Sequence, residues 1–337
     1  MFAISPDWMP NWRRWAAAAL VVAVLGAVVA AVHAATLRPA AARGGPAVPA
    51  SLPGPAGSVG PVPPEPLGVD WLAMHPPPDL GIHADAAVLL DLDTHEVMWA
   101  RDPHGRRPPA SLTKLLTAMV ASDLAPSLDQ PVTVPVEATQ VEADSTVMGL
   151  SPGETVTVRE LLYGVFLVSG NDAAETLARA LTSRERFVQL MNEKAAALGM
   201  RDSTFTNPSG LDDPGLRSSA YDLAIATVAV AARYPALLAI AGARDVDLPA
   251  SDAHKEFFLR TLIKLVSVYP GATGLKSGYT DDAGYCLVGT AARGDRHLAV
   301  VLLHSDLALT VDATRLLDYG FGLPPAERLE PGAIPQP

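Results

Sequence analysis

Ser111 and Lys114 stand three residues apart in the stretch Ser-Leu-Thr-Lys, a spacing that puts both side chains on one face of a helix. A serine hydroxyl is a weak nucleophile until a base removes its proton. A buried lysine near a helix N-terminus has a lowered pKa and can be that base. The chain has only five lysines, which favours a functional lysine. A serine N-cap followed by a solvated lysine is the competing interpretation.

Two further stretches carry polar side chains that could hold a substrate. Ser169 and Asn171, separated by one glycine, follow an apolar segment where an unpaired polar group is costly. Lys276, Ser277 and Gly278 precede a β-rich run. A cation, a hydroxyl and a glycine on one strand can bind a carboxylate while the backbone approaches closely. The plain structural interpretations are a capping turn for the first stretch and an exposed strand-edge lysine for the second.

The elements that must position these side chains are hairpins and helices. Alternating apolar runs predict antiparallel hairpins over residues 86–100 and 285–303. Apolar periodicity predicts helices that begin at Ser111, as an N-cap, and that span residues 187–198 and 311–319. Hairpins at both ends of a helical middle favour a mixed α/β (α+β) fold, with an antiparallel sheet built from both termini and flanked by helices.

Composition excludes several classes of protein. The formal net charge is −11, from 25 Lys+Arg against 36 Asp+Glu, and no basic run marks a nucleic-acid binder. The single cysteine, Cys286, excludes a disulfide framework and a cysteine-rich zinc site, and we expect it to be a buried apolar residue. The eight histidines show no metal-ligand spacing, so no metal site is expected.

The N-terminal part predicts export from the cytoplasm. Residues 1–15 carry Arg13 and Arg14 near their end and are expected to be a cytoplasmic N-terminus. The apolar residues 16–35 predict a transmembrane anchor or a cleaved signal peptide. The Pro/Ala/Gly-rich residues 36–78 predict a linker. One folded domain is expected over residues 79–325, followed by a tail at 326–337. This arrangement predicts a location at the extracytoplasmic face of a cell envelope, membrane-anchored or secreted.

The three polar stretches together resemble the Ser-x-x-Lys, Ser-x-Asn and Lys-[Ser/Thr]-Gly motifs of serine penicillin-recognising enzymes. The text around them, including LLYGVFLVSGNDAAETLA, FTNPSGLDD and YPGATGLKSGYTDDAGYCLV, resembles the low-molecular-mass D-alanyl-D-alanine carboxypeptidases. The resemblance covers about residues 80 to 322. It implies a β-lactamase/transpeptidase-like fold and a serine peptidase that removes the terminal D-alanine from bacterial peptidoglycan stem peptides. β-Lactam antibiotics are implied as covalent inhibitors.

The resemblance also implies the catalytic roles. Ser111 would attack the carbonyl of the penultimate D-alanine and form an acyl-enzyme, with Lys114 as the base. Ser169 would relay a proton towards the leaving amine. Water would then hydrolyse the ester.

Five further residues are implied to bind the substrate. Asn171 would bond the substrate amide and orient the lysine base, and Lys276 and Ser277 would bind the terminal carboxylate. Gly278 would allow close approach of the strand. The backbone N–H groups of the nucleophile and of Tyr279 would form the oxyanion hole.

Some features depart from the family, and three alternative functions stay open. Ser277 replaces the usual threonine, and residues 260–263 replace an Asn-Thr-Asn-like stretch, which leaves the substrate contacts of that loop in question. A D,D-endopeptidase that cuts peptidoglycan cross-links would use the same site. A class A β-lactamase is disfavoured because Ser203 stands four residues before Asn207, where such enzymes need a glutamate. A non-catalytic wall-binding scaffold is disfavoured by the complete set of motif residues.

Overall fold

The computed structural model describes residues 66–142 and 145–322. The expected cytoplasmic segment 1–15, the anchor or signal 16–35, most of the linker and the tail 326–337 lie outside the described residues. Among the described residues, no single helix is long and apolar enough to cross a bilayer.

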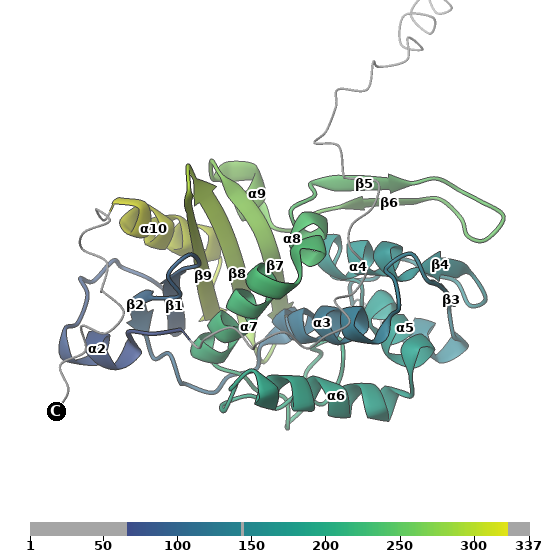
Figure 1. The fold of residues 1–337 in the computed structure, drawn as a ribbon, viewed down its shortest axis with the longest axis horizontal. Coiled ribbons are helices and arrows are strands. Elements are labelled where there is room, and N and C mark those ends of the chain that lie inside the picture. The colour runs from purple at the N-terminus through teal and green to yellow at the C-terminus, as the bar shows by residue number, and fades with distance from the viewer. Residues whose placement is uncertain (1–65, 143–144, 323–337) are drawn as a thin grey trace, which may run out of the picture. The chain divides into compact units, whose positions relative to one another are not determined.

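A five-stranded antiparallel sheet lies at the centre of the described part (Figure 1). Its strands are β1 (Ala86–Asp91), β2 (Val97–Arg101), β7 (Ala272–Thr280), β8 (Gly284–Arg293) and β9 (Arg296–Ser305). The order β2-β1-β9-β8-β7 places the N-terminal hairpin beside the three C-terminal strands. The expected sheet from both termini is therefore confirmed, and β7 is one of its two edge strands.

Helices cover one face of the sheet and bury the larger core cluster against it. They are α3 (Lys114–Leu124), α4 (Val158–Leu167), α5 (Asn171–Leu181), α6 (Arg184–Ala197), α7 (Ala220–Arg233) and α8 (Pro235–Ala241). Taken together, α7 and α8 reach the length and apolar content of a membrane span, but they are bent by 107°. Two ribbons and a 3₁₀ turn complete this side: β3 (Pro131–Thr133) with β4 (Thr155–Thr157), β5 (Asp245–Leu248) with β6 (Phe257–Arg260), and η2 (Val136–Thr139).

Two helices, α9 (Lys264–Val268) and α10 (Leu309–Gly322), cover the other face of the sheet. They pack on Leu89, Leu298 and Val300, which point away from the main helical layer. Because both faces are covered, strand β1 is buried at all six positions instead of alternating between apolar and polar.

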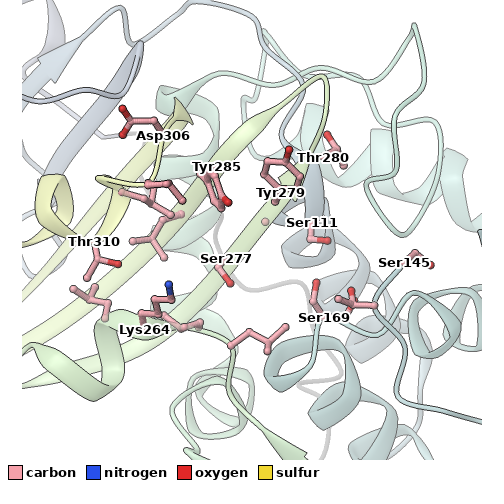
Figure 2. Close-up of a pocket in the computed structure, with 18 of the residues that line it drawn as sticks. Ser111, Ser145, Ser169, Lys264, Ser277, Tyr279, Thr280, Tyr285, Asp306 and Thr310 are labelled. Carbon is pink, nitrogen blue, oxygen red and sulfur yellow. The ribbon is translucent and has the colours of Figure 1, made fainter. Parts of the chain in front are cut away.

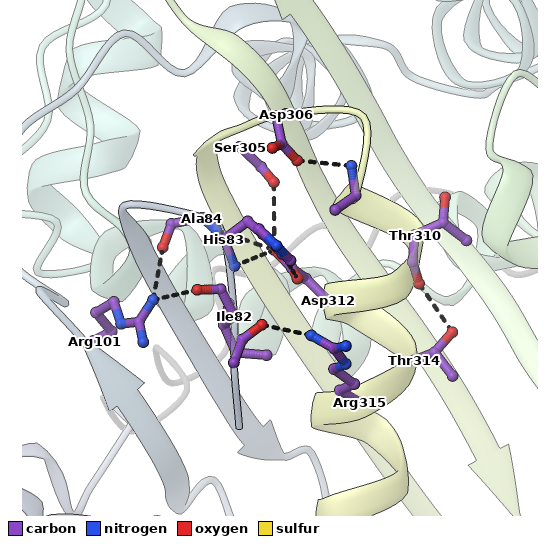
Figure 3. Close-up of polar contacts among 12 residues, drawn as sticks. Ile82, His83, Ala84, Arg101, Ser305, Asp306, Thr310, Asp312, Thr314 and Arg315 are labelled. Atoms are coloured by element: carbon purple, nitrogen blue, oxygen red, sulfur yellow. Dashed lines mark hydrogen bonds and ion pairs between the residues drawn. The ribbon is translucent and has the colours of Figure 1, made fainter. Parts of the chain in front are cut away.

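Figure 3 shows how α10 is fastened to the chain that enters β1. The buried carboxylate of Asp312 accepts the backbone N–H groups of His83 and Ala84 at 2.8 and 3.0 Å. It also accepts the Ser305 hydroxyl at 3.4 Å. A buried carboxylate needs such donors, because leaving it unpaired would cost several kcal/mol. These bonds fix the outer helix against the sheet.

Two expectations are corrected by the structure. Helix α2 (Val69–Met74) lies within the expected linker, and its Leu72 is buried in the main core, so the folded part begins before residue 79. Ser111 is not an N-cap: it lies in the 3₁₀ turn η1 (Ala110–Thr113), which leads into α3. A 3₁₀ turn has three residues per turn, so side chains three positions apart eclipse each other. This geometry brings the two expected catalytic side chains together.

Candidate active site

The Lys114 amine lies at hydrogen-bond distance from the Ser111 hydroxyl, with 2.8 Å between Nζ and Oγ. Nζ also bonds Oδ1 of Asn171 at 2.7 Å and the carbonyl oxygen of Ser209 at 2.6 Å. Both of these oxygens only accept hydrogen bonds. A neutral amine therefore gives its two hydrogens to them and turns its lone pair towards Ser111.

Lys114 is completely buried, so the interpretation as a solvated lysine is wrong. Burial lowers the pKa of Lys114 well below its usual range, and the positive charge of Lys276 lowers it further. The carboxylates of Asp172 and Glu175 act in the opposite direction. The net effect lowers the pKa and so shifts Lys114 towards the neutral amine, which is the form that can accept a proton.

The turn between α4 and α5 directs Ser169 towards a second buried lysine. Ser169 has a φ of 58°, a left-handed conformation that serine rarely adopts and that surrounding contacts must hold in place. One such contact is the Thr146 hydroxyl, which donates to the Ser169 carbonyl at 2.9 Å. Nζ of Lys276 donates to Oγ of Ser169 at 3.0 Å and to the Ser277 carbonyl at 2.6 Å. Burial lowers the pKa of Lys276 to about 7, so the interpretation as an exposed edge lysine is wrong.

Strand β7 passes so close to Ser111 that any side chain at position 278 would push the strand and the Ser111 turn apart. A Cβ on Gly278 would lie 2.8 Å from the Ser111 backbone nitrogen and 3.0 Å from Cβ of Ala110. The next backbone nitrogen along the strand is that of Tyr279, so the Ser111 and Tyr279 N–H groups belong to the same corner of the site. Two backbone donors beside a nucleophile can bind an oxyanion.

These residues line a cleft of about 360 Å³ that runs along the β7 edge of the sheet. Figure 2 shows Ser111 and Ser169 at one end and the side chains of β7 along its floor. Six predicted site residues line the cleft: Ser111, Ser169, Asn171, Ser277, Gly278 and Tyr279. The other two, Lys114 and Lys276, are buried beside it. The structure thus brings together the seven motif residues and Tyr279, which the family resemblance added.

Asp172 was missed by sequence reasoning, although it holds the wall opposite β7. Its buried carboxylate accepts the backbone N–H groups of Met148, Gly149 and Leu150 at 2.7 to 2.9 Å. It also accepts the N–H of Ala173 at 2.8 Å. Four donors fix the segment before α4 against the N-terminus of α5. The only signal in the sequence is an acidic residue in the first turn of a helix.

The loop 207–212 was quoted only for its resemblance to relatives, yet it supplies the Ser209 carbonyl. The Asn207 side chain holds this loop by accepting the N–H of Gly210 at 2.6 Å and that of Ser209 at 3.2 Å. A Cβ on Gly210 would lie 2.0 Å from the Ala110 carbonyl oxygen. Glycine is required there because the loop packs directly under the turn that carries the nucleophile.

A contact across the mouth of the cleft joins this loop to the end of β7. The Thr280 hydroxyl donates to Oδ1 of Asp212 at 2.6 Å, and the N–H of Asp282 reaches Oδ2 at 3.4 Å. Thr280 directly follows Tyr279, so this bond steadies the backbone that carries the second oxyanion donor.

Two other residues that could do chemistry, Arg293 and Cys286, lie away from the site. Arg293 bonds the Tyr269 hydroxyl at 2.6 Å and Asp318 at 3.2 Å, and it does not line the cleft. Cys286 is buried as expected, and burial raises the pKa of its thiol to about 12. Within residues 66–142 and 145–322, no group of three or more histidine, cysteine, aspartate or glutamate side chains is arranged to hold a metal ion.

A serine hydroxyl beside a buried neutral lysine, with two backbone donors at its side, is the site of an enzyme that works through an acyl-serine. Residues 72–306 match the family described as D-alanyl-D-alanine carboxypeptidase, peptidase family S11. The chain belongs to this family, whose members are serine-type carboxypeptidases.

Individual relatives agree with this assignment. The chain is 38% identical over 249 residues to the D-alanyl-D-alanine carboxypeptidase DacB2 of Mycobacterium tuberculosis, covering 72% of this chain and 84% of the relative. It is 34% identical over 251 residues to DacF of Bacillus subtilis, where it spans only 63% of the relative's length. A crystal structure of a D-alanyl-D-alanine carboxypeptidase from M. tuberculosis superposes with a TM-score of 0.67 at 36% identity, covering 81% of this chain and 97% of that chain.

A related enzyme of a second activity has the same fold. A mutant of the Streptomyces K15 DD-transpeptidase superposes with a TM-score of 0.67 at 28% identity, covering 73% of this chain and all of that chain. The expected β-lactamase/transpeptidase-like architecture is therefore confirmed.

Proposed function

We propose that this chain is a serine D-Ala-D-Ala carboxypeptidase that removes the terminal D-alanine from peptidoglycan stem peptides. The observation that carries the proposal is the 2.8 Å contact between Nζ of Lys114 and Oγ of Ser111. The amine gives its two hydrogens to Oδ1 of Asn171 and to the Ser209 carbonyl oxygen. Its lone pair therefore points towards the Ser111 hydroxyl. This geometry activates one serine and requires no metal or organic cofactor.

Acylation follows from the positions of these groups. Oγ of Ser111 attacks the carbonyl carbon of the penultimate D-alanine while its proton passes to Nζ of Lys114. The carbonyl oxygen becomes an oxyanion and accepts bonds from the Ser111 and Tyr279 N–H groups. Removing one such donor typically slows an enzyme by about 10²- to 10³-fold. The peptide C–N bond then breaks, and the ester to Ser111 forms.

The leaving amine needs a proton as the C–N bond breaks. Ser169 lies beside the nucleophile and accepts a bond from Lys276, so its own hydroxyl hydrogen is free to point into the cleft. The proton taken by Lys114 can therefore reach the amine through Ser169, and free D-alanine departs. Water then attacks the ester with Lys114 again as the base, which regenerates Ser111 and releases the shortened peptide.

The acyl-enzyme is tested by mass spectrometry of the full chain after a short incubation with benzylpenicillin. A β-lactam ring amide mimics the scissile dipeptide, so we expect one adduct of the mass of the antibiotic on wild type. The Ser111→Ala variant should carry none. Ser145→Ala is the matched control, because Ser145 lines the same cleft without a role in the chemistry. A folded wild-type chain without an adduct would overturn the mechanism and favour a wall-binding scaffold.

The endopeptidase activity that uses the same site is distinguished by substrate. Purified stem pentapeptide and cross-linked peptide dimer are offered separately, and products are followed by liquid chromatography. We expect faster release of D-alanine from the pentapeptide. Faster cleavage of the dimer would replace the carboxypeptidase assignment with an endopeptidase one.

We also propose that residues 16–35 tether the enzyme to the outer face of the cytoplasmic membrane. The support is the charge-free run that follows two arginines, with a Pro-rich segment between it and the folded part. A reporter enzyme that is active only outside the cytoplasm, fused after residue 78, should be active in a bacterial host. N-terminal sequencing then separates the two forms of export: an intact start indicates an anchor, and a start near residue 36 indicates a cleaved signal. An inactive reporter would refute export.

A further inference from the structure

Lys264 is the one basic residue among the described residues that line the cleft. It is the first residue of α9, and its side chain is exposed. Figure 2 shows the amine of Lys264 beyond Ser277, on the side away from Ser111 and Ser169. A basic side chain at this place has no part in the mechanism above.

The other four lysines all have partners. Lys114 and Lys276 are buried and bonded within the site. Lys194 pairs with Asp123, and Lys255 pairs with Glu154 at 3.5 Å. Within the described residues, no hydrogen bond or ion pair engages Lys264. A free ammonium on a long flexible stem can therefore reach a ligand in the cleft.

The register of the sheet gives the position of Lys264 relative to the reacting bond. Its neighbour Leu265 packs on Gly289, where an added Cβ would lie 2.7 Å from Cδ2 of Leu265. Gly289 pairs with Leu275 of β7, two residues before Ser277. Gly278, which lies against the Ser111 backbone, comes on the other side of Ser277 along β7. Lys264 thus lies at the Ser277 end of the cleft.

A second part of the cleft lies around Tyr279, further along β7 from Lys264. Tyr279, Tyr285 and Asp306 line it, and the two tyrosines face each other across β7 and β8. Asp306, the only carboxylate among the lining residues, follows Ser305, which pairs with Tyr285. It therefore lies further along the sheet from Lys264, whose neighbour Leu265 packs on Gly289.

The leaving residue of the proposed substrate carries a carboxylate one residue beyond the scissile carbonyl. Lys276 is a poor sole partner for it, because its amine is buried and already donates to Ser169 and to the Ser277 carbonyl. The Ser277 hydroxyl offers one neutral hydrogen bond. A chain with a net charge of −11 also repels an anionic peptide. A free cation beside Ser277 is the group that this subsite needs.

We propose that Lys264 is the counter-ion of the leaving residue's carboxylate and that it sets the preference of the enzyme for peptides with a free C-terminus. This inference rests on the proposed carboxypeptidase function. It assigns a specificity-determining role to a residue on α9, outside the three motifs.

The test compares two substrates on the full chain: N-acyl-L-Lys-D-Ala-D-Ala with a free carboxylate, and the same peptide with a C-terminal amide. The variants are Lys264→Met, which keeps the length of the side chain, and Lys264→Arg, which keeps the charge. Lys255→Met is the matched control, since it removes one positive charge outside the cleft. The extent of benzylpenicillin acylation after a long incubation is measured in parallel to establish that Ser111 is active and the fold is intact. The rate of this acylation is not used as the control, because the antibiotic carries a carboxylate of its own.

For Lys264→Met we expect kcat/KM to fall about 10- to 100-fold on the carboxylate peptide, the range of a charge-assisted hydrogen bond. It should stay within about threefold of wild type on the amide. Lys264→Arg should restore most of the preference, and Lys255→Met should leave it unchanged. Added salt should reduce the wild-type preference and leave that of Lys264→Met unaffected.

The inference is overturned if Lys264→Met keeps the wild-type preference, if it loses both substrates equally, or if Lys255→Met loses as much. Each of these results leaves the carboxypeptidase function standing, provided that wild type releases D-alanine. A wild-type chain that is neither acylated nor able to release D-alanine would instead remove the proposed function, and this inference with it.

Discussion

Replacing Gly278 with alanine separates the geometry of the oxyanion hole from every side chain of the site. The glycine has no positive φ, so its backbone conformation accepts alanine. The added methyl group would lie 2.8 Å from the Ser111 nitrogen, whereas ordinary van der Waals contact begins at 3.4 Å. Strand β7 and the turn η1 must therefore move apart by about 0.6 Å.

The displacement falls on the two groups proposed to bind the oxyanion. Misplacement by about 1 Å can cost an enzyme roughly 100-fold in rate, and loss of one oxyanion donor costs about 10²- to 10³-fold. We therefore expect acylation of Gly278→Ala to be about 100-fold slower than that of wild type. Overpacking in a well-packed region also costs about 1–3 kcal/mol of stability. Because the free energy of unfolding of a native protein is typically about 5–15 kcal/mol, the variant should still fold.

The assay is the rate of benzylpenicillin acylation, followed by mass spectrometry, together with thermal unfolding of the same samples. Gly322→Ala is the control, because an added Cβ there meets nothing within 4 Å. Its acylation rate should equal that of wild type. Acylation of Gly278→Ala within threefold of wild type, in a folded protein, would refute the assignment of the oxyanion hole.

Three further predictions concern charge and support. Lys276→Met removes the cation that lowers the pKa of Lys114, so this pKa should rise. In a pH–rate profile of acylation, the ascending limb, where Lys114 loses its proton, should therefore move to higher pH. Asp172→Asn should lower the free energy of unfolding by about 2–4 kcal/mol in urea titration, because the new side-chain NH2 group would face two of the four buried N–H donors and leave them without an acceptor. Thr280→Val breaks the bond to Asp212 and should slow acylation by about tenfold in the penicillin assay, with little change in melting temperature.

Each of these expectations has a result that contradicts it. An unmoved or lowered pH limb in Lys276→Met would mean that the Lys276 charge does not act on the base. A loss under about 1 kcal/mol for Asp172→Asn would mean that the segment 148–150 is held by other contacts. A normal rate in Thr280→Val would mean that the oxyanion backbone is rigid without the bond at the cleft mouth.

The two buried lysines also affect stability as a function of pH. Their folded-state pKa values lie below that of an unfolded lysine. Between about pH 7, the value for Lys276, and the unfolded value near 10.5, the unfolded chain therefore binds more protons than the folded one. Stability should rise with pH across this window, because the slope follows the difference in bound protons. A Lys276→Met variant should lose part of this slope in unfolding experiments.

The sequence by itself determined the chemistry and much of the architecture. The three motifs singled out seven of the eight residues that the cleft brings together, and the family resemblance added Tyr279 and the catalytic roles. The hairpins at both ends of the chain predicted the sheet. These features are local, since a nucleophile and its base three residues apart and alternating apolar runs are set by neighbouring residues. Helix starts were less certain. Ser111 was expected as an N-cap and instead lies in a 3₁₀ turn, because strand β7 and loop 207–212 pack directly against it.

Only the tertiary structure decided what lies around those motifs. The Ser209 carbonyl bonds Lys114, and the Asp172 carboxylate bonds the backbone of Met148. Both contacts join segments far apart in the chain, so no local sequence pattern predicts them. The burial of Lys114 and Lys276, which decides whether each amine is a base or a solvated charge, depends on which helices cover the sheet. In the sequence, Lys264 is indistinguishable from an ordinary surface lysine. Only the packing of α9 on the sheet places it in the cleft beside Ser277. The types and spacing of residues indicate which chemistry is possible. Whether that chemistry occurs depends on desolvation and proximity, and both are properties of the packed fold.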